Sequence, residues 1–177
     1  MILDKLADAF DPQRPEALLI GGLALPAYGV VRQTLDVDCV AAADAAPKLH
    51  RVLIAAGYEE AGSSETVARY RHASPMLLDV DLMLVDRETY DKLLRDSRAW
   101  PPEQNRWRVP SLPHLAALKL HAIKNNPDRR GKDVGDIADL VRRHPKALAR
   151  DEMRELCERF GPANIFEEIE KLNLWKS

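Results

Sequence analysis

Two short segments, LDVDCV at residues 35–40 and LDVDLML at residues 78–84, place two aspartates one residue apart between apolar residues. Successive side chains of a β-strand point to opposite faces of the sheet, so each segment predicts a strand with one apolar and one acidic face. Asp36 and Asp38 share the acidic face of the first strand, and Asp79 and Asp81 share that of the second. If the two strands are neighbours in one sheet, their carboxylates cluster on a single surface.

Such a cluster of carboxylates points to a binding site for cations. The acids repel one another, which raises at least one pKa unless a cation lies among them. Oxygen-only sites suit Mg²⁺, and two such ions can bind a phosphoryl group during in-line displacement. The alternative is that the acids only line a solvated face of the sheet. Gly21 and Gly22 favour the site, because glycines after a strand let backbone N–H groups approach a phosphate.

The rest of the chain predicts an α/β part up to about residue 110, followed by a helical part. Strands are expected at residues 17–20, 35–41, 66–72, 76–85 and 107–109. Helices are expected at residues 2–10, 45–56, 87–96, 112–125, 132–144, 151–160 and 163–172, with a helical turn at 22–28. The expected domains are therefore 1–110, a mixed α/β core, and 111–177, a helical part packed on that core.

Two charged residues fall on the apolar sides of the predicted C-terminal helices. Lys119 lies near the centre of the apolar stripe of residues 112–125. A lysine there either extends its amine to water or meets an anion such as a phosphate. Because methionine keeps the length of the side chain and suits the apolar stripe, Lys119→Met is expected to fold at least as well as the parent. Asp133 lies on the apolar side of the next helix, where it is either an N-cap after Gly131 or part of a site.

Composition narrows the class of protein. With 46% hydrophobic and 31% charged residues in 177, the chain is globular rather than disordered. A net charge of −2 gives no overall basic field to attract nucleic acid. Cys39 and Cys157 form no disulfide or zinc pattern, which is typical of a reducing compartment. Without a signal peptide or an apolar run long enough to span a membrane, a cytoplasmic location and no membrane partner are expected.

Four motifs together resemble the nucleotidyltransferase superfamily. The segment GGLALPAYGVVRQTLDVDCV resembles its opening Gly-Gly and D-x-D motif, and DVDLML resembles its third-carboxylate strand. The segments LAALKLHA and KDVGDIADL resemble its two downstream helical motifs. The form R-x-T-x-D-x-D is most similar to the AbiEii-type nucleotidyltransferases, many of which are toxins of toxin–antitoxin pairs.

The resemblance implies a small mixed sheet with flanking helices, and transfer of a nucleoside monophosphate from a metal-bound nucleoside triphosphate to an acceptor. It also implies two Mg²⁺ ions. The implied metal ligands and catalytic acids are Asp36, Asp38 and Asp81, with Asp79 as the alternative to Asp81. The implied nucleotide-binding residues are Gly21, Gly22, Arg32, Thr34 and Lys119. Lys119 and Asp133 complete the implied catalytic set, with Asp136 as the alternative to Asp133.

The acceptor and the alternatives to catalysis stay open. The resembling toxins point to RNA, in particular tRNA, as the acceptor and to an antitoxin protein as a partner. The basic residues Arg129, Arg130 and Lys132 near the implied site favour RNA, whereas the short helical part leaves little surface for a large acceptor. A D-x-D phosphatase is disfavoured because the apolar run follows Asp36 instead of preceding it. The remaining alternative is a non-catalytic member of the same fold that binds a nucleotide or a protein.

Overall fold

The computed structural model describes residues 2–10, 15–101 and 106–175. The chain divides into two compact units, one of Met1–Ala27 with Arg32–Pro110 and the other of Tyr28–Val31 with Ser111–Ser177. The longer segment of the second unit begins at Ser111, one residue after the expected end of the α/β part. The second unit also includes the four residues Tyr28–Val31, which the sequence analysis placed in the first part.

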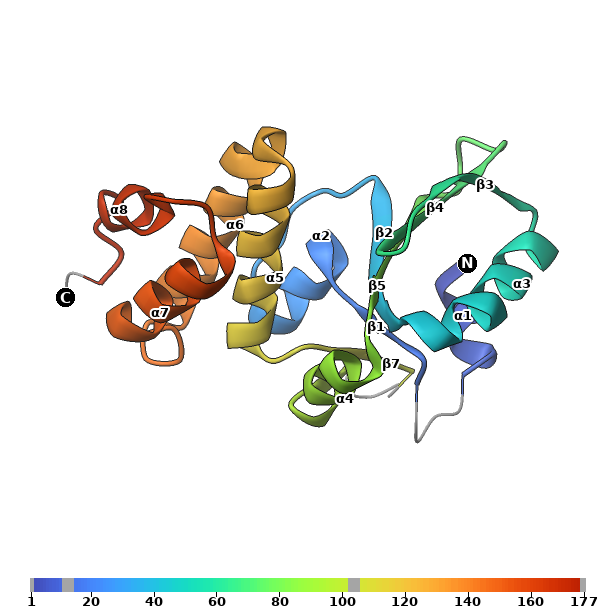
Figure 1. Cartoon of the computed structure of the whole chain (residues 1–177), viewed down its shortest axis with the longest axis horizontal. Coiled ribbons are helices and arrows are strands. Elements are labelled where there is room, and N and C mark those ends of the chain that lie inside the picture. Colours follow the sequence, from blue (N-terminus) through green and yellow to red (C-terminus); the bar gives the residue numbers. More distant parts are fainter. Residues whose placement is uncertain (1, 11–14, 102–105, 176–177) are drawn as a thin grey trace. The chain divides into compact units, whose positions relative to one another are not determined.

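The first unit is built on a five-stranded sheet with the strand order β1-β2-β5-β4-β3 (Figure 1). Its strands are β1 (Ala17–Leu19), β2 (Asp36–Ala42), β3 (Tyr58–Ser63), β4 (Val67–His72) and β5 (Asp79–Val85). β2 and β5 pair in parallel, and the other pairs are antiparallel, so the sheet is mixed. A separate two-stranded ladder joins β6 (Arg98–Trp100) to β7 (Trp107–Val109). The predicted mixed α/β fold class is confirmed.

Helices cover both faces of this sheet. They are α1 (Ile2–Asp8), α2 (Gly21–Ala24), α3 (Ala46–Ala55) and α4 (Arg87–Arg95), with 3₁₀ turns at Leu25–Tyr28 and Ala43–Ala45. α1 and α3 lie on one side of the sheet and α2 lies on the other (Figure 1). α4 begins at a side-chain cap, in which a carboxylate oxygen of Asp86 accepts from the Thr89 backbone N–H at 2.7 Å.

The apolar face of the sheet packs against α3. Leu49 and Leu53 of α3 are fully buried, as their helical spacing predicts, and each such side chain contributes about 1.5–3 kcal/mol to stability. Val37 of β2 and Val80 of β5 are fully buried on the sheet. The alternate residues of these two strands therefore face away from this core.

One strand of the sheet was not predicted. β3 has the sequence YEEAGS and is exposed from its second residue on, so it lacks the apolar alternation that marks a half-buried strand. It is the edge strand beside β4, with a bulge between Glu60 and Gly62. β5 begins at Asp79 instead of Met76, because residues 74–77 form a turn in which the Leu77 N–H donates to the Ser74 carbonyl at 3.2 Å.

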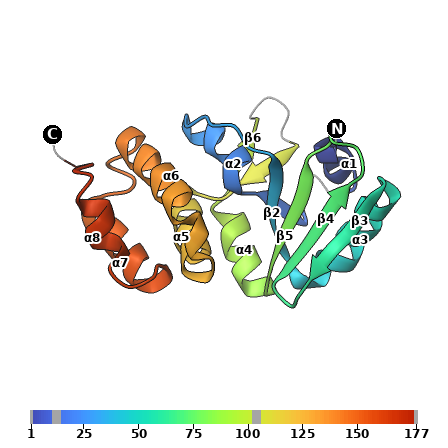
Figure 2. The same cartoon turned by 90° about the horizontal axis from the view of Figure 1, so that it is seen from above.

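The second unit is helical in its described part. Its helices are α5 (Leu112–Asn125), α6 (Arg130–Arg143), α7 (Arg150–Phe160) and α8 (Ile165–Glu170), with a 3₁₀ turn at Pro127–Arg129. α5 contacts both α6 and α7, and α7 contacts α8 (Figure 2). His144 holds the Tyr28 segment through a 2.9 Å contact between its Nε2 and the Tyr28 carbonyl.

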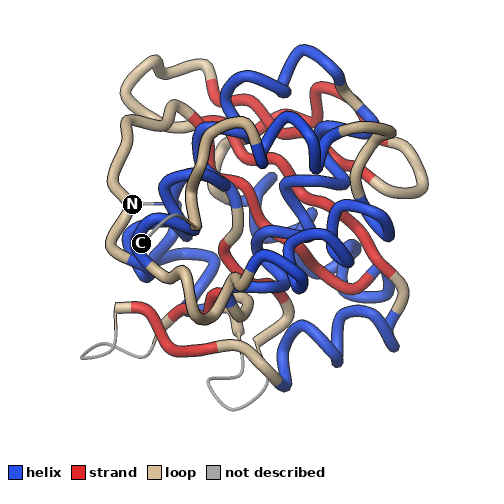
Figure 3. Tube along the Cα trace, turned by 90° about the vertical axis from the view of Figure 1, so that its left-hand side faces the viewer, coloured by secondary structure: helices blue, strands red, loops and turns tan. Residues whose placement is uncertain are grey.

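Figure 3 distinguishes helices and strands along the chain trace. Among the described residues, no helix combines the length and the apolar composition needed to cross a membrane.

Candidate functional site

Four aspartates lie on one face of two neighbouring parallel strands. β2 and β5 pair in a register that sets Asp36 opposite Asp79 and Asp38 opposite Asp81. Cross-strand partners share a face of the sheet, and the intervening Val37 is fully buried on the other face. The four carboxylates therefore form one half-exposed cluster, which we call the acidic face. The condition set by the sequence, that the two D-x-D strands be neighbours, is met.

The Gly-Gly turn lies directly against this face. Gly21 has a φ of +60°, and a Cβ built on it would lie 2.0 Å from Oδ2 of Asp38. A Cβ on Gly22 would lie 2.7 Å from the Cβ of Thr34. Both positions lack room for a side chain, and the left-handed conformation at Gly21 is one that glycine adopts without strain. The turn therefore brings backbone against the Asp38 carboxylate.

The residues just before β2 complete this part of the site. Thr34 donates a hydrogen bond from Oγ1 to Oδ1 of Asp36 at 2.5 Å, which orients that carboxylate. Arg32 donates to the carbonyl of Gln33 at 2.9 Å, and its Nη1 would lie 3.1 Å from a Cβ on Gly22. The structure thus gathers the predicted residues Gly21, Gly22, Arg32 and Thr34 around the two aspartates of β2, all within the first unit.

A cation of β4 that the sequence analysis missed reaches the same face. Arg71 places Nε 3.1 Å from Oδ2 of Asp79 and donates from Nη1 to Oδ1 of Asp81 at 2.8 Å. These carboxylates, the hydrogen-bonded Asp81 above all, raise the pKa of the Arg71 guanidinium. A second arginine, Arg69, has Nε 3.9 Å from Oδ2 of Asp81. The alternation in VARYRH, which sets both arginines on one face, is the sequence signal that could have revealed them.

The donor atoms of the acidic face suit a hard divalent cation, because they are all carboxylate oxygens. Asp36 and Asp38 would hold such an ion, with Asp81 as a third ligand only if Arg71 released it. Among the residues that the structure describes, no three His, Cys, Asp or Glu side chains lie close enough together to hold a metal ion. The residue types fit Mg²⁺.

The remaining predicted site residues form a buried ion cluster in the second unit. Lys119 has Nζ 2.6 Å from Oδ2 of Asp136 and 3.2 Å from Oδ1 of Asp133. Arg129 has Nε 2.9 Å from Oδ2 of Asp133. Lys119 is 4% exposed and Asp133 is 0% exposed. Both candidates for the later acid, Asp133 and its alternative Asp136, therefore bind the same lysine.

This cluster corrects two interpretations drawn from the sequence. Lys119 does not extend its amine to water but pairs with Asp133 and Asp136, so we now expect Lys119→Met to fold less stably than the parent. Asp133 is not an N-cap, because α6 begins at Arg130 with Arg129 as its N-cap. Buried charges are retained where they are paired, and the two aspartates supply the anions that the lysine needs.

Gly21→Ala tests how tightly the turn is set against Asp38. We expect it to lower the free energy of unfolding by about 1–2 kcal/mol from the left-handed backbone alone, with a further loss because the new Cβ displaces the carboxylate. Chemical denaturation measures the change. Gly131→Ala is the matched control, because Gly131 lies in α6 with open space around it and should gain up to about 1 kcal/mol. Equal stability of the two variants would contradict the close approach.

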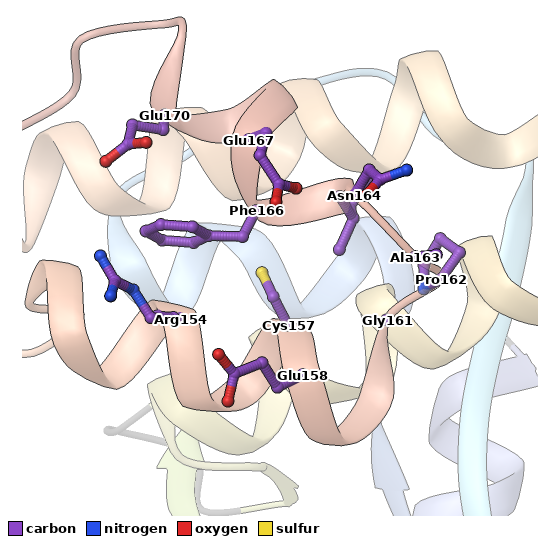
Figure 4. A pocket seen from close by; sticks show the side chains of 11 residues that line it. Arg154, Cys157, Glu158, Gly161, Pro162, Ala163, Asn164, Phe166, Glu167 and Glu170 are labelled. Atoms are coloured by element: carbon purple, nitrogen blue, oxygen red, sulfur yellow. The ribbon is translucent and has the colours of Figure 1, made fainter.

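A cavity of about 420 Å³ lies between α7 and α8 of the second unit (Figure 4). The guanidinium carbon of Arg154 lies 5.0 Å from the ring centroid of Phe166, a distance typical of a cation–π contact. Burial raises the pKa of the Cys157 thiol to about 12, so the thiol is protonated at neutral pH and a poor nucleophile. The sequence analysis predicted no site here, and the side chains that line the cavity offer no activated nucleophile.

Comparison with known proteins identifies the fold. Neither a protein-family model nor a curated protein sequence matches the chain. The antibiotic-resistance factor ANT(2'')-Ia superposes with a TM-score of 0.64 and 13% identity over 97% of this chain and 95% of that chain. The Megavirus polyadenylate synthase superposes with a TM-score of 0.58 and 14% identity over 81% of this chain. The chain spans 31% of that enzyme.

A third match belongs to the same fold. An antigenic nucleotidyltransferase-like protein from Paracoccidioides brasiliensis has a TM-score of 0.51 and 14% identity over 96% of this chain and 92% of that chain. At such identities the likeness concerns the fold alone. The mixed sheet and flanking helices are those of the nucleotidyltransferase fold, as the resemblance of the motifs implied.

Proposed function

We propose that the protein transfers a nucleoside monophosphate from a nucleoside triphosphate to an acceptor and releases pyrophosphate. The observation that carries the proposal is the register of β2 and β5, which sets four carboxylates together beside a glycine turn on a nucleotidyltransferase fold. The same fold without that cluster would support only binding, because a fold by itself does not determine a function.

The residues of the acidic face have complementary parts in this reaction. Asp36, oriented by Thr34, and Asp38, beside Gly21, would hold the divalent ions, with Asp81 as the third carboxylate. Mg²⁺ would neutralise charge on the triphosphate and polarise the α-phosphoryl group. An acceptor hydroxyl attacks the α-phosphorus in line and loses its proton to solvent. Its oxygen–phosphorus bond forms, and the bond to the bridging oxygen of pyrophosphate breaks. The proposal does not require Lys119 to touch a phosphate; that implied contact stays a prediction.

For the acceptor we propose RNA, with tRNA first, as in the AbiEii-type toxins that the R-x-T-x-D-x-D motif resembles. An antitoxin partner belongs to the same proposal. The basic residues Arg129, Arg130 and Lys132 support an RNA acceptor less strongly than the sequence analysis suggested. Arg129 is paired with Asp133, and Arg130 has Nη2 2.6 Å from Oε2 of Glu168, so two of these charges already have anionic partners.

A small-molecule acceptor is the second candidate. The chain matches the antibiotic-resistance factor ANT(2'')-Ia over nearly the full length of both chains, so the two proteins have similar size as well as the same fold. A protein of this size has room for a small acceptor without an additional RNA-binding domain. Antibiotics are therefore included as acceptors in the experiment below.

Labelled nucleotides test the proposal directly. We expect the protein with Mg²⁺ and each α-³²P-labelled nucleoside triphosphate to label either a band of total RNA or a compound in an antibiotic panel, depending on the acceptor. Label should come from the α position only, because the β- and γ-phosphates leave as pyrophosphate. Asp81→Asn, which keeps the shape of the side chain and removes its charge, should abolish the label.

Two outcomes would reject this assignment. Label that appears from a γ-³²P nucleotide would mean phosphoryl transfer instead of nucleotidyl transfer. Nucleotide that raises the melting temperature of the protein without any labelled product would favour the non-catalytic member of the fold.

A further inference from the structure

The structure assigns a second role to Arg71 of β4: we propose that its guanidinium is the resident counter-ion of the acidic face and competes with divalent metal ions for Asp81. The consequence is that Arg71 sets the concentration of metal at which the site fills. This inference rests on the proposed function, since it concerns the metal that the proposed reaction uses.

The position of Arg71 follows from the registers of three neighbouring strands. β5 pairs with β2 on one side, which places Asp79 beside Asp36 and Asp81 beside Asp38. It pairs with β4 on the other side, where Arg69 lies directly opposite Asp81. Arg71 lies two residues further along β4 and so shares that face of the sheet. The acidic face is thus bordered by an arginine strand that can supply positive charge to it.

The contacts of Arg71 use the atoms that a metal would need. Its Nη1 donates to Oδ1 of Asp81 at 2.8 Å, and its Nε lies 3.1 Å from Oδ2 of Asp79. One planar guanidinium thereby bridges two carboxylates through two different nitrogens held in a fixed geometry. A divalent ion bound to the same Asp81 oxygen would meet the guanidinium at short range, and the two positive charges would repel each other. Metal and Arg71 therefore compete for this oxygen of Asp81.

The bridge between Arg71 and the two aspartates is exposed enough to be exchanged. The Arg71 side chain is 41% exposed, and those of Asp79 and Asp81 are 40% and 28% exposed. Ion pairs that water reaches are weak, so a divalent ion can replace one. The Asp36 carboxylate also raises the pKa of the Arg71 guanidinium, although less than Asp81 and Asp79 do.

Binding of Mn²⁺ alone, without nucleotide, tests this competition. We expect Arg71→Gln to bind Mn²⁺ about tenfold more tightly than the parent, because the competing cation is gone. Arg69→Gln is the matched control, because Arg69 lies on the same strand and face, 3.9 Å from Asp81, with a side chain that is 58% exposed. It should stay within about threefold of the parent, as expected for an exposed and distant pair. Electron paramagnetic resonance of free Mn²⁺ gives each dissociation constant.

Stability in EDTA separates competition from a purely structural role. Without metal, Arg71→Gln should melt at a lower temperature than Arg69→Gln, because the carboxylates lose their bridging counter-ion. Added Mn²⁺ should then stabilise Arg71→Gln by more than it stabilises the parent. Arg71→Lys keeps the charge without the planar bridge and should have an affinity for Mn²⁺ between those of the parent and Arg71→Gln.

The proposal is overturned if Arg71→Gln, folded as judged by circular dichroism, binds Mn²⁺ no more tightly than the parent. If Arg71→Gln does not fold, Arg71→Lys decides in its place, and Mn²⁺ affinity at or below that of the parent rejects the competition. These results are independent of the labelling experiment. A parent that transfers nucleotide while Arg71→Gln shows unchanged Mn²⁺ affinity would reject the role of Arg71 alone.

Discussion

Lys119→Met is expected to lower the free energy of unfolding by about 3–5 kcal/mol, as measured by chemical denaturation. The lysine has its amine within 3.2 Å of Oδ1 of Asp133 and within 2.6 Å of Oδ2 of Asp136, and all three side chains are buried. Methionine fits the apolar stripe of α5 but brings no positive charge. Asp136 would then lose its Lys119 partner in a low-dielectric environment. The free-energy cost of that loss exceeds the gain from burying a methionine.

Two further variants test whether charge pairing is the cause. Lys124→Met changes the same residue type on the same helix at an exposed position and should shift stability by no more than about 0.5 kcal/mol. Lys119→Met combined with Asp136→Leu removes both charges of the shorter pair and leaves Asp133 with Arg129. It should recover a large part of the lost stability, because buried ion pairs can be replaced by apolar side chains of similar volume. Lys119→Met and Lys124→Met with the same midpoint of unfolding would contradict the role of the cluster.

Asp38→Asn is expected to reduce nucleotidyl transfer by at least about 100-fold while the metal-free protein keeps its fold. Asp38 lies against the Gly21 turn and opposite Asp81, so it is the carboxylate that joins the glycine turn to the two strands. The amide keeps the shape of the side chain and removes a charge that repels its neighbours. The melting temperature in EDTA should therefore be unchanged or raised.

The same variant should lose the stabilisation that Mg²⁺ and a non-hydrolysable triphosphate give to the parent. At 100 times the dissociation constant, a ligand adds about 2.7 kcal/mol to stability. For a protein of this size that corresponds to a rise in melting temperature of about 5–10 °C. Asp139→Asn, on the exposed face of α6, should keep both the rise and the activity. A large drop in the EDTA melting temperature of Asp38→Asn would show that Asp38 is structural.

Local patterns determined much of the acidic face. The alternation in LDVDCV and LDVDLML required each pair of aspartates to share a face, because the period of a strand is two residues whatever its neighbours are. The burial of Val37 and Val80 opposite the aspartates follows from the same period. The role of Gly21 could also be predicted, because a glycine after an apolar run suggests a backbone conformation that is strained for other residues. Its φ of +60° is such a conformation.

Local patterns failed where partners come from distant parts of the chain. β3 has no apolar alternation, and only its pairing with β4 makes it a strand. Arg71 looked like an ordinary polar residue of a half-buried strand, because its ion pairs with Asp79 and Asp81 depend on a strand register that no single segment encodes. The position of Lys119 within an apolar stripe could be predicted from the sequence. Its two anionic partners could not, because they lie on another helix.

The sequence by itself determined which side chains share a face of each strand and helix, because that depends only on the 2.0 and 3.6 residue periods of the backbone. Only the tertiary structure decided which of those faces meet. It made β2 and β5 parallel neighbours with aspartate opposite aspartate, set Arg71 across two of these carboxylates, and enclosed Lys119 between Asp133 and Asp136. The physical reason is that electrostatic pairing acts over a few ångströms in space, and separation along the chain does not fix which charges come that close.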